Sequence, residues 1–182
     1  MSPFIRRLQR AYDEIMEDVC LQKLPVVFCI DRAGIVGADG ETHHGIFDLS
    51  YLKHMPNLTV MAPKDGRELE AMMEFAAEAE GPCAIRYPRG EAENFGTDSV
   101  IEAGRAEVIR EGKDTEIWAI GAMVKKALDA ADILEDKGIS AGVVNMRFLK
   151  PFDLSCFADQ QIDSSLYLRL RTTLFPEEPE RK

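Results

Sequence analysis

Short apolar runs alternate with amphipathic segments along most of this chain. The runs at residues 25–30, 57–62 and 83–87 are typical of buried strands. Residues 67–79, between the second and third runs, carry apolar side chains at helical spacing. This alternation favours an α/β fold, in which parallel strands of one sheet are joined by crossover helices.

The ends of the predicted helices carry local signals. Asp65, with Glu68 three residues later, predicts a capping box at the start of the helix that ends near residue 79. Residues 8–21 predict a further amphipathic helix before the first strand. In the second half of the chain, residues 123–137 predict another helix, and Gly138 is placed to end it.

The polar segment at residues 91–98 lacks any periodicity and separates two strand-and-helix units. Strands are predicted after it at residues 106–110, 115–120 and 141–146, the first of them at a sheet edge. The sequence therefore predicts a first domain at residues 1–92, a linker at 93–102, a second domain at 103–170 and a charged tail at 171–182.

Charge and cysteine content limit the classes of function. The chain of 182 residues has a formal net charge of −10, which disfavours binding to nucleic acid or to an anionic membrane surface. No apolar run approaches the roughly 20 residues of a membrane span. The four cysteines form no C-x-x-C pair, which fits a reducing, cytoplasmic environment.

The segment DRAGIVGADGETHHG, residues 31–45, directly follows the first predicted strand. Open α/β sheets bind ligands at the carboxyl ends of their strands, and glycines let a ligand approach the backbone. The adjacent His43 and His44 titrate near neutral pH and are candidates for proton transfer, although solvated loop histidines remain an equal alternative. With three histidines in the whole chain, no metal site is predicted.

Two arginines follow predicted strands and are candidates for phosphate binding. Arg32 comes after the first strand and Arg89 after the third. If these strands are neighbours, both guanidinium groups emerge at one edge, an arrangement suited to a small phosphorylated substrate. The alternative is a surface ion pair, such as Arg32 with Asp31. The chain contains neither G-x-G-x-x-G nor a P-loop.

Several ordered segments together resemble one enzyme family. These are LQRAYD at 8–13, the loop at 31–45, FDLSYL at 47–52, MAP at 61–63 and RYPRG at 86–90. Over about residues 8–153 the chain resembles the 1-deoxy-D-xylulose-5-phosphate synthases, members of the transketolase-like, thiamine-diphosphate-dependent enzymes. The resemblance implies part of a parallel-sheet pyrimidine-binding domain, followed by a truncated α/β transketolase C-terminal domain.

The resemblance also implies an activity and cofactors. Enzymes of this family condense pyruvate with glyceraldehyde 3-phosphate and release CO2, which supplies precursors of isoprenoids, thiamine and pyridoxal. They use thiamine diphosphate with Mg2+ and form homodimers. The family's metal ligands are not expected in this chain.

Roles carry over to individual residues of this chain. The resemblance implies that Arg32 and Arg89 hold the phosphate of the acceptor substrate. It implies that His43 contacts the reacting substrate and serves proton transfer, with Asp39 supporting the same site. In the family, aromatic rings flank the aminopyrimidine of the cofactor, and Phe4 is the candidate for this cofactor-binding role.

The sequence departs from the family in ways that leave several functions open. The family's cofactor-activating glutamate and its diphosphate-binding domain have no counterpart in these 182 residues, so the chain by itself is expected to be inactive. It is alternatively a non-catalytic module that pairs with a full-length subunit, or one half of a split synthase that pairs with a complementary fragment. A β subunit of a 2-oxo-acid dehydrogenase is a weaker alternative, which residues 31–45 disfavour.

Overall fold

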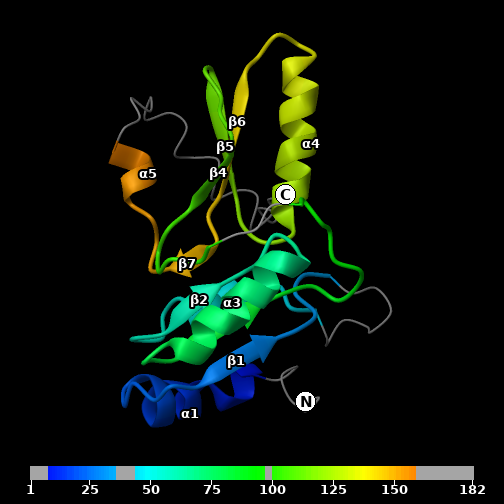
Figure 1. Cartoon of the computed structure of the whole chain (residues 1–182). Helices are drawn as coiled ribbons and strands as arrows, with labels where there is room; N and C mark the ends of the chain where they lie inside the picture. Colours follow the sequence, from blue (N-terminus) through cyan, green and yellow to red (C-terminus); the bar gives the residue numbers. More distant parts are fainter. Residues whose placement is uncertain (1–7, 36–43, 97–99, 159–182) are drawn as a thin grey trace, which may run out of the picture.

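A computed structural model describes residues 8–35, 44–96 and 100–158, which form two β-sheets, one above the other in Figure 1. The helical elements are α1 (Tyr12–Glu14), the π-helix η2 (Ile15–Cys20), α2 (Asp48–Leu52), α3 (Gly66–Glu78), α4 (Met123–Glu135) and α5 (Ser155–Ala158). The strands are β1 (Val27–Ile30), β2 (Thr59–Met61), β3 (Cys83–Arg86), β4 (Glu107–Arg110), β5 (Thr115–Ala119), β6 (Ala141–Asn145) and β7 (Phe148–Lys150).

The first sheet has the strand order β1-β3-β2-β7. β3 pairs in parallel with both β1 and β2, which confirms the predicted parallel α/β sheet. β7 joins as an antiparallel edge strand next to β2, although it comes from the far end of the described chain. The sequence did not indicate this strand, because a three-residue segment carries too little periodicity to be recognised.

Helical segments cover both faces of the first sheet. Because successive strand residues point to opposite sides, each face contributes alternate residues of the strands to a separate core. On one face, Val60 and Ala84 pack with residues of η2 and α2, including Ile15 and Leu52. On the other face, neighbouring strand residues pack under α3. That core comprises Met61, Met72, Ala76, Cys83, Ile85 and Phe148. The central strands β2 and β3 are thereby largely buried, as their continuous apolar runs predict, whereas the edge strands β1 and β7 are mostly half-buried.

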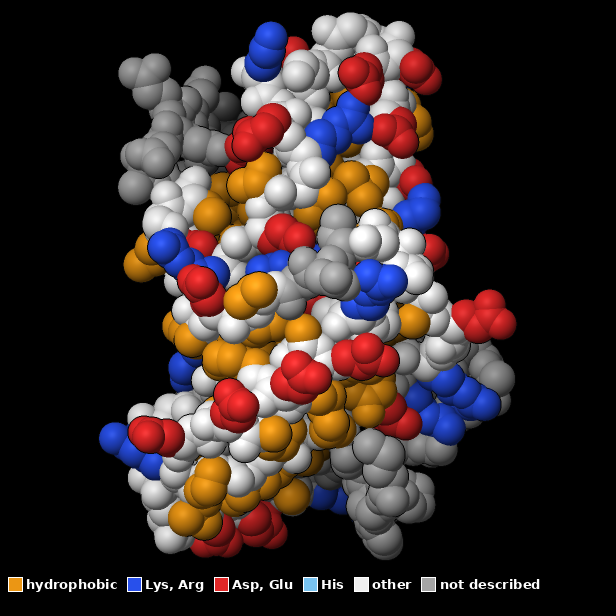
Figure 2. All heavy atoms as spheres, in the orientation of Figure 1, with side chains coloured by type: hydrophobic (Ala, Val, Ile, Leu, Met, Phe, Trp, Pro, Cys, Tyr) orange, Lys and Arg blue, Asp and Glu red, His pale blue; other side chains and the backbone are white. Residues whose placement is uncertain are grey.

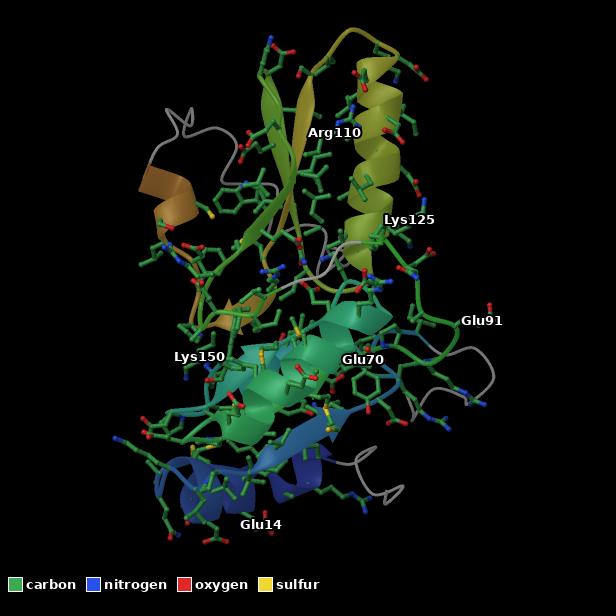
Figure 3. The ribbon with its side chains drawn as sticks, viewed as in Figure 1. Glu14, Glu70, Glu91, Arg110, Lys125 and Lys150 are labelled. Carbon is green, nitrogen blue, oxygen red and sulfur yellow. The ribbon has the colours of Figure 1, made fainter. Side chains whose placement is uncertain are left out.

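The second sheet has the strand order β4-β6-β5. β5 and β6 are parallel and are connected by α4. β4 lies at a sheet edge, as predicted, and it pairs with β6 in the antiparallel direction. α4 packs Val124, Ala127 and Ala131 against Ala141 and Val143. On the outer surface, Arg110 of β4 forms ion pairs with Asp132 and Glu135 of α4 (Figure 3).

The helix α3 has one buried face and one exposed face. Met72 and Ala76 are buried, while Glu70, Glu74 and Glu78 follow one another at i, i+4 on the exposed face. Acidic side chains accordingly gather over this region of the surface in Figure 2. None of the helices among the described residues is long and apolar enough to cross a membrane.

Of the two hydrogen bonds of the predicted capping box at the start of α3, the structure has one. The Asp65 side chain accepts a hydrogen bond from the Glu68 backbone N–H at 2.8 Å, as an N-cap residue should. The Glu68 side chain does not return to Asp65. Its Oε2 accepts from the backbone N–H of Lys64 at 2.6 Å, and its carboxylate faces the second sheet.

Candidate active site

Parallel pairing of β1 and β3 brings two predicted site segments to one edge of the first sheet. Ile30 lies beside Arg86 in the register of the two strands. Beyond the strand ends, the N–H of Tyr87 donates to the Ile30 carbonyl at 3.0 Å, and the N–H of Ala33 donates to the Tyr87 carbonyl at 3.1 Å. The segments carrying Arg32 and Arg89 are therefore neighbours, as the sequence argument required.

Arg32 is held in an unusual backbone conformation. Its φ is +60°, in the left-handed region that residues other than glycine seldom adopt. The side chain is 13% exposed, and its Nε lies 3.7 Å from the Asp31 carboxylate. Positive-φ residues persist where the surrounding structure over-determines them, and such positions cluster at functional sites. Arg89, by contrast, lies on an exposed turn.

The base of the loop at residues 31–45 is closed by backbone hydrogen bonds. Gly34 and Gly45 each donate their N–H to the other's carbonyl, at 3.0 and 2.9 Å. Gly34 has φ of +84°, which glycine adopts without strain. A Cβ on Gly45 would lie 2.6 Å from both the Arg32 carbonyl oxygen and an Asp48 carboxylate oxygen. Glycine at position 45 is therefore required by close packing against the Arg32 backbone.

Arg86 holds this loop base from the end of β3. Its Nη2 donates to the Gly45 carbonyl at 2.6 Å, and its Nε lies 3.3 Å from the Asp48 carboxylate. The Tyr51 hydroxyl donates to the other Asp48 oxygen at 3.1 Å. Burial, together with the neighbouring Asp48 carboxylate, raises the pKa of Tyr51 well above its ordinary value.

Sequence reasoning did not assign this holding role to Arg86. Its position next to the segment 87–90 was the available signal, but its partners are 38 and 41 residues away in sequence. The other predicted site residues, His43, Asp39 and Phe4, lie outside the described residues. Among the residues that the structure describes, no group of three or more His, Cys, Asp or Glu side chains is arranged to hold a metal ion.

Comparison with known proteins identifies the family. Residues 2–94 match the model for the transketolase pyrimidine binding domain, and residues 104–162 match that for the transketolase C-terminal domain. The chain belongs to the transketolase family. The first match alone covers half of its 182 residues. This confirms the predicted fold and the family resemblance.

Two curated relatives and one solved structure indicate the branch of the family. The chain is 57% identical over 149 residues to 1-deoxy-D-xylulose-5-phosphate synthase of Heliobacterium modesticaldum, and 57% identical over 152 residues to that of Desulforudis audaxviator. These matches cover 80% and 82% of this chain but 23% and 24% of the relatives. The transketolase-family chain thus spans about a quarter of their length.

The solved structure is described as a split gene transketolase in an inactive β4 tetramer. It superposes with a TM-score of 0.74 at 41% identity, covering 82% of this chain and 48% of that chain. The architecture seen here is therefore shared with a transketolase whose coding sequence is divided.

Proposed function

We propose that this transketolase-family chain forms the acceptor-substrate side of a 1-deoxy-D-xylulose-5-phosphate synthase. The observation that carries the proposal is the 57% identity to two such enzymes over 149 and 152 residues. The reaction joins the two-carbon unit left after pyruvate loses CO2 to the aldehyde carbon of glyceraldehyde 3-phosphate.

Each site residue has a proposed role in substrate binding, proton transfer or positioning. Arg32 and Arg89 bind the phosphate of glyceraldehyde 3-phosphate, because a guanidinium group matches phosphate in charge and in its pattern of hydrogen bonds. His43 supplies the proton that the aldehyde oxygen takes up as the new C–C bond forms, and Asp39 supports it. Arg86 and Gly45 position the Arg32 backbone through the contacts described above.

Thiamine diphosphate is the cofactor of the family. We propose no described residue of this chain as its anchor. Thiamine diphosphate, when bound, supplies the carbon nucleophile of the reaction. Within the described part of the chain no metal-ligating cluster is available for a diphosphate-bound Mg2+. A ring-stacking role for Phe4 remains part of the proposal.

A chimaeric enzyme tests this function. The matching 149 residues of the Heliobacterium modesticaldum relative are replaced by those of this chain, and formation of deoxyxylulose phosphate is measured. We expect turnover, and we expect Arg32→Ala to raise the KM for glyceraldehyde 3-phosphate by about tenfold, equivalent to about 1.4 kcal/mol of lost binding.

The control is Arg110→Ala, which removes an arginine paired with α4 on the second sheet. It should leave that KM unchanged. An inactive chimaera that is folded, or an unchanged KM in Arg32→Ala, contradicts the proposal. A polypeptide of these 182 residues alone is expected to give no turnover with added thiamine diphosphate and Mg2+.

A second candidate function is one half of a split synthase. The likeness to the split gene transketolase favours it. It predicts that this chain co-purifies with a separately produced polypeptide matching the preceding part of the curated relatives, and that the mixture is active. A non-catalytic pairing module would bind a full-length subunit without adding activity.

A further inference from the structure

Five polar side chains meet where the carboxyl-end edges of the two sheets face each other. Lys64 and Glu68 come from the segment after β2 and from α3, on the first-sheet side. Glu107 of β4 and Asn145 of β6 come from the second sheet, and Arg147 lies in the short connection from β6 to β7. Glu68 is completely buried, and Lys64, Asn145 and Arg147 are buried as well. We call these five residues the interdomain network.

Glu68 lies at the centre of the interdomain network. Its Oε1 accepts from Arg147 Nε at 2.7 Å and from Asn145 Nδ2 at 2.9 Å. The same oxygen lies 3.5 Å from Lys64 Nζ. The carboxylate of a first-sheet helix thus accepts hydrogen bonds from Asn145 of the second sheet and from Arg147, in addition to its contacts with the neighbouring Lys64.

Glu107 completes the network and balances its charge. Its Oε2 accepts from Lys64 Nζ at 2.7 Å and lies 3.1 Å from Arg147 Nη2. Two carboxylates therefore face one ammonium and one guanidinium group. Each sheet side contributes at least one charge whose partner lies on the other side, so separating the sheets leaves buried charges on both.

The position of the interdomain network gives it significance. The carboxyl-end edge of an α/β sheet is where a ligand is usually bound. Here the ends of β2 and β6 face one another, and side chains of the chain itself occupy the space between them. The Ala62 N–H also donates to the Arg147 carbonyl at 3.0 Å, although Arg147 has a strained φ of +52°.

We propose that the interdomain network, centred on Glu68, couples the two sheets into a single cooperative folding unit. A buried charge whose partner is removed strongly destabilises a fold, because its desolvation is no longer compensated. Opening either sheet strips Glu68 or Arg147 of its partners, so neither sheet unfolds while the other stays native. The contribution of Glu68 is separable from that of β7, which a substitution at Glu68 leaves intact.

Urea unfolding with one probe for each sheet tests the proposal. Trp118 of β5 is the single tryptophan of the chain, so its fluorescence reports on the second sheet. Pulsed hydrogen exchange at the amides of Ala84 and Ile85 in β3 reports on the first sheet. We expect coincident midpoints in the unmodified chain, and midpoints separated by about 1 M urea in Glu68→Gln.

Glu70→Gln is the matched control. It is the same chemical change on the exposed face of the same helix, where Figure 3 labels Glu70. Its two midpoints should stay coincident. Separated midpoints in the unmodified chain, or coincident midpoints in a folded Glu68→Gln variant, would overturn the proposal.

A milder variant keeps the test decisive if Glu68→Gln does not fold. The Glu107 side chain is 22% exposed, so Glu107→Gln removes one charge from the more solvent-exposed part of the interdomain network. We expect it to fold and to separate the two midpoints by a smaller interval. Coincident midpoints in Glu107→Gln would then count against the coupling.

Discussion

The Arg86 guanidinium donates to the Gly45 carbonyl oxygen at 2.6 Å, which ties the end of β3 to the base of the loop that follows β1. The same side chain reaches the Asp48 carboxylate at 3.3 Å. One arginine thereby holds two ends of the candidate site together across a gap of about forty residues in sequence.

Arg86→Met should destabilise the chain by about 2 kcal/mol, because charged hydrogen bonds to a partly buried carbonyl and carboxylate are lost while the aliphatic volume is kept. Urea unfolding measures this loss. The comparison variant is Arg110→Met, whose acidic partners on α4 are largely exposed and which should lose less stability. Equal losses in both variants would show that Arg86 contributes only a surface ion pair.

Gly45→Ala should be destabilising by about 1–3 kcal/mol, since the added methyl group would lie 2.6 Å from backbone and carboxylate oxygens. Gly81→Ala is the matched control, because a Cβ there meets nothing within 4 Å. Thermal unfolding of the two variants gives the comparison. If Gly45→Ala melts with the unmodified chain, the close approach to the Arg32 carbonyl is not a constraint.

Asp65→Ala should lower stability by about 1–2 kcal/mol through loss of the N-cap of α3. Asp65 also accepts from the Phe95 N–H at 3.3 Å, so hydrogen exchange at that amide should quicken. Asp65→Ser, which restores a capping oxygen, should recover most of the stability. The exposed Asp18 is the control position, where alanine should change stability by less than about 0.5 kcal/mol.

Acid should weaken the contact between the sheets. Burial raises the pKa of Glu107, but hydrogen bonding to Lys64 and the charge of Arg147 outweigh it and bring the pKa below its ordinary value of 4.5. A carboxyl group with a lowered pKa in the folded state contributes stability above its unfolded pKa. That stability is lost as the pH falls through the folded pKa. Unfolding free energy should therefore decrease as the pH falls below about 4.5.

Comparison with Glu107→Gln isolates this contribution. Asp153, whose pKa is lowered to about 2, also loses stabilising ionisation in acid, but it does so in both proteins. The difference in urea midpoint between the unmodified chain and Glu107→Gln should shrink as the pH falls from 7 toward 3. A difference that stays constant over this range would contradict the assigned ionisation of Glu107.

Local signals in the sequence predicted most elements of the fold. Asp65 caps α3, and Gly138, with φ of +77°, follows the end of α4 as expected. The N-terminal helical segment is predicted correctly in position, but its turns at residues 15–20 are of the π type. Such features depend on neighbours within a few residues, which is why periodicity and end residues suffice to find them.

Tertiary structure decided how these elements meet. The sequence placed Arg32 and Arg89 after strands, and the pairing of β1 with β3 brought their segments to one edge. The partners of Arg86 lie far away in sequence, so no local pattern could reveal them. The same holds for β7, which closes the first sheet from the second half of the chain.

Glu68 shows the difference most directly. By itself the sequence determined that a carboxylate stands three residues after a helix cap, and this spacing is typical of a capping box. Only the tertiary structure brought Asn145 and Arg147 to that carboxylate from 77 and 79 residues away. A buried carboxylate is stable only where strong hydrogen-bond donors compensate its desolvation. The packing of the two sheets sets the positions of those donors.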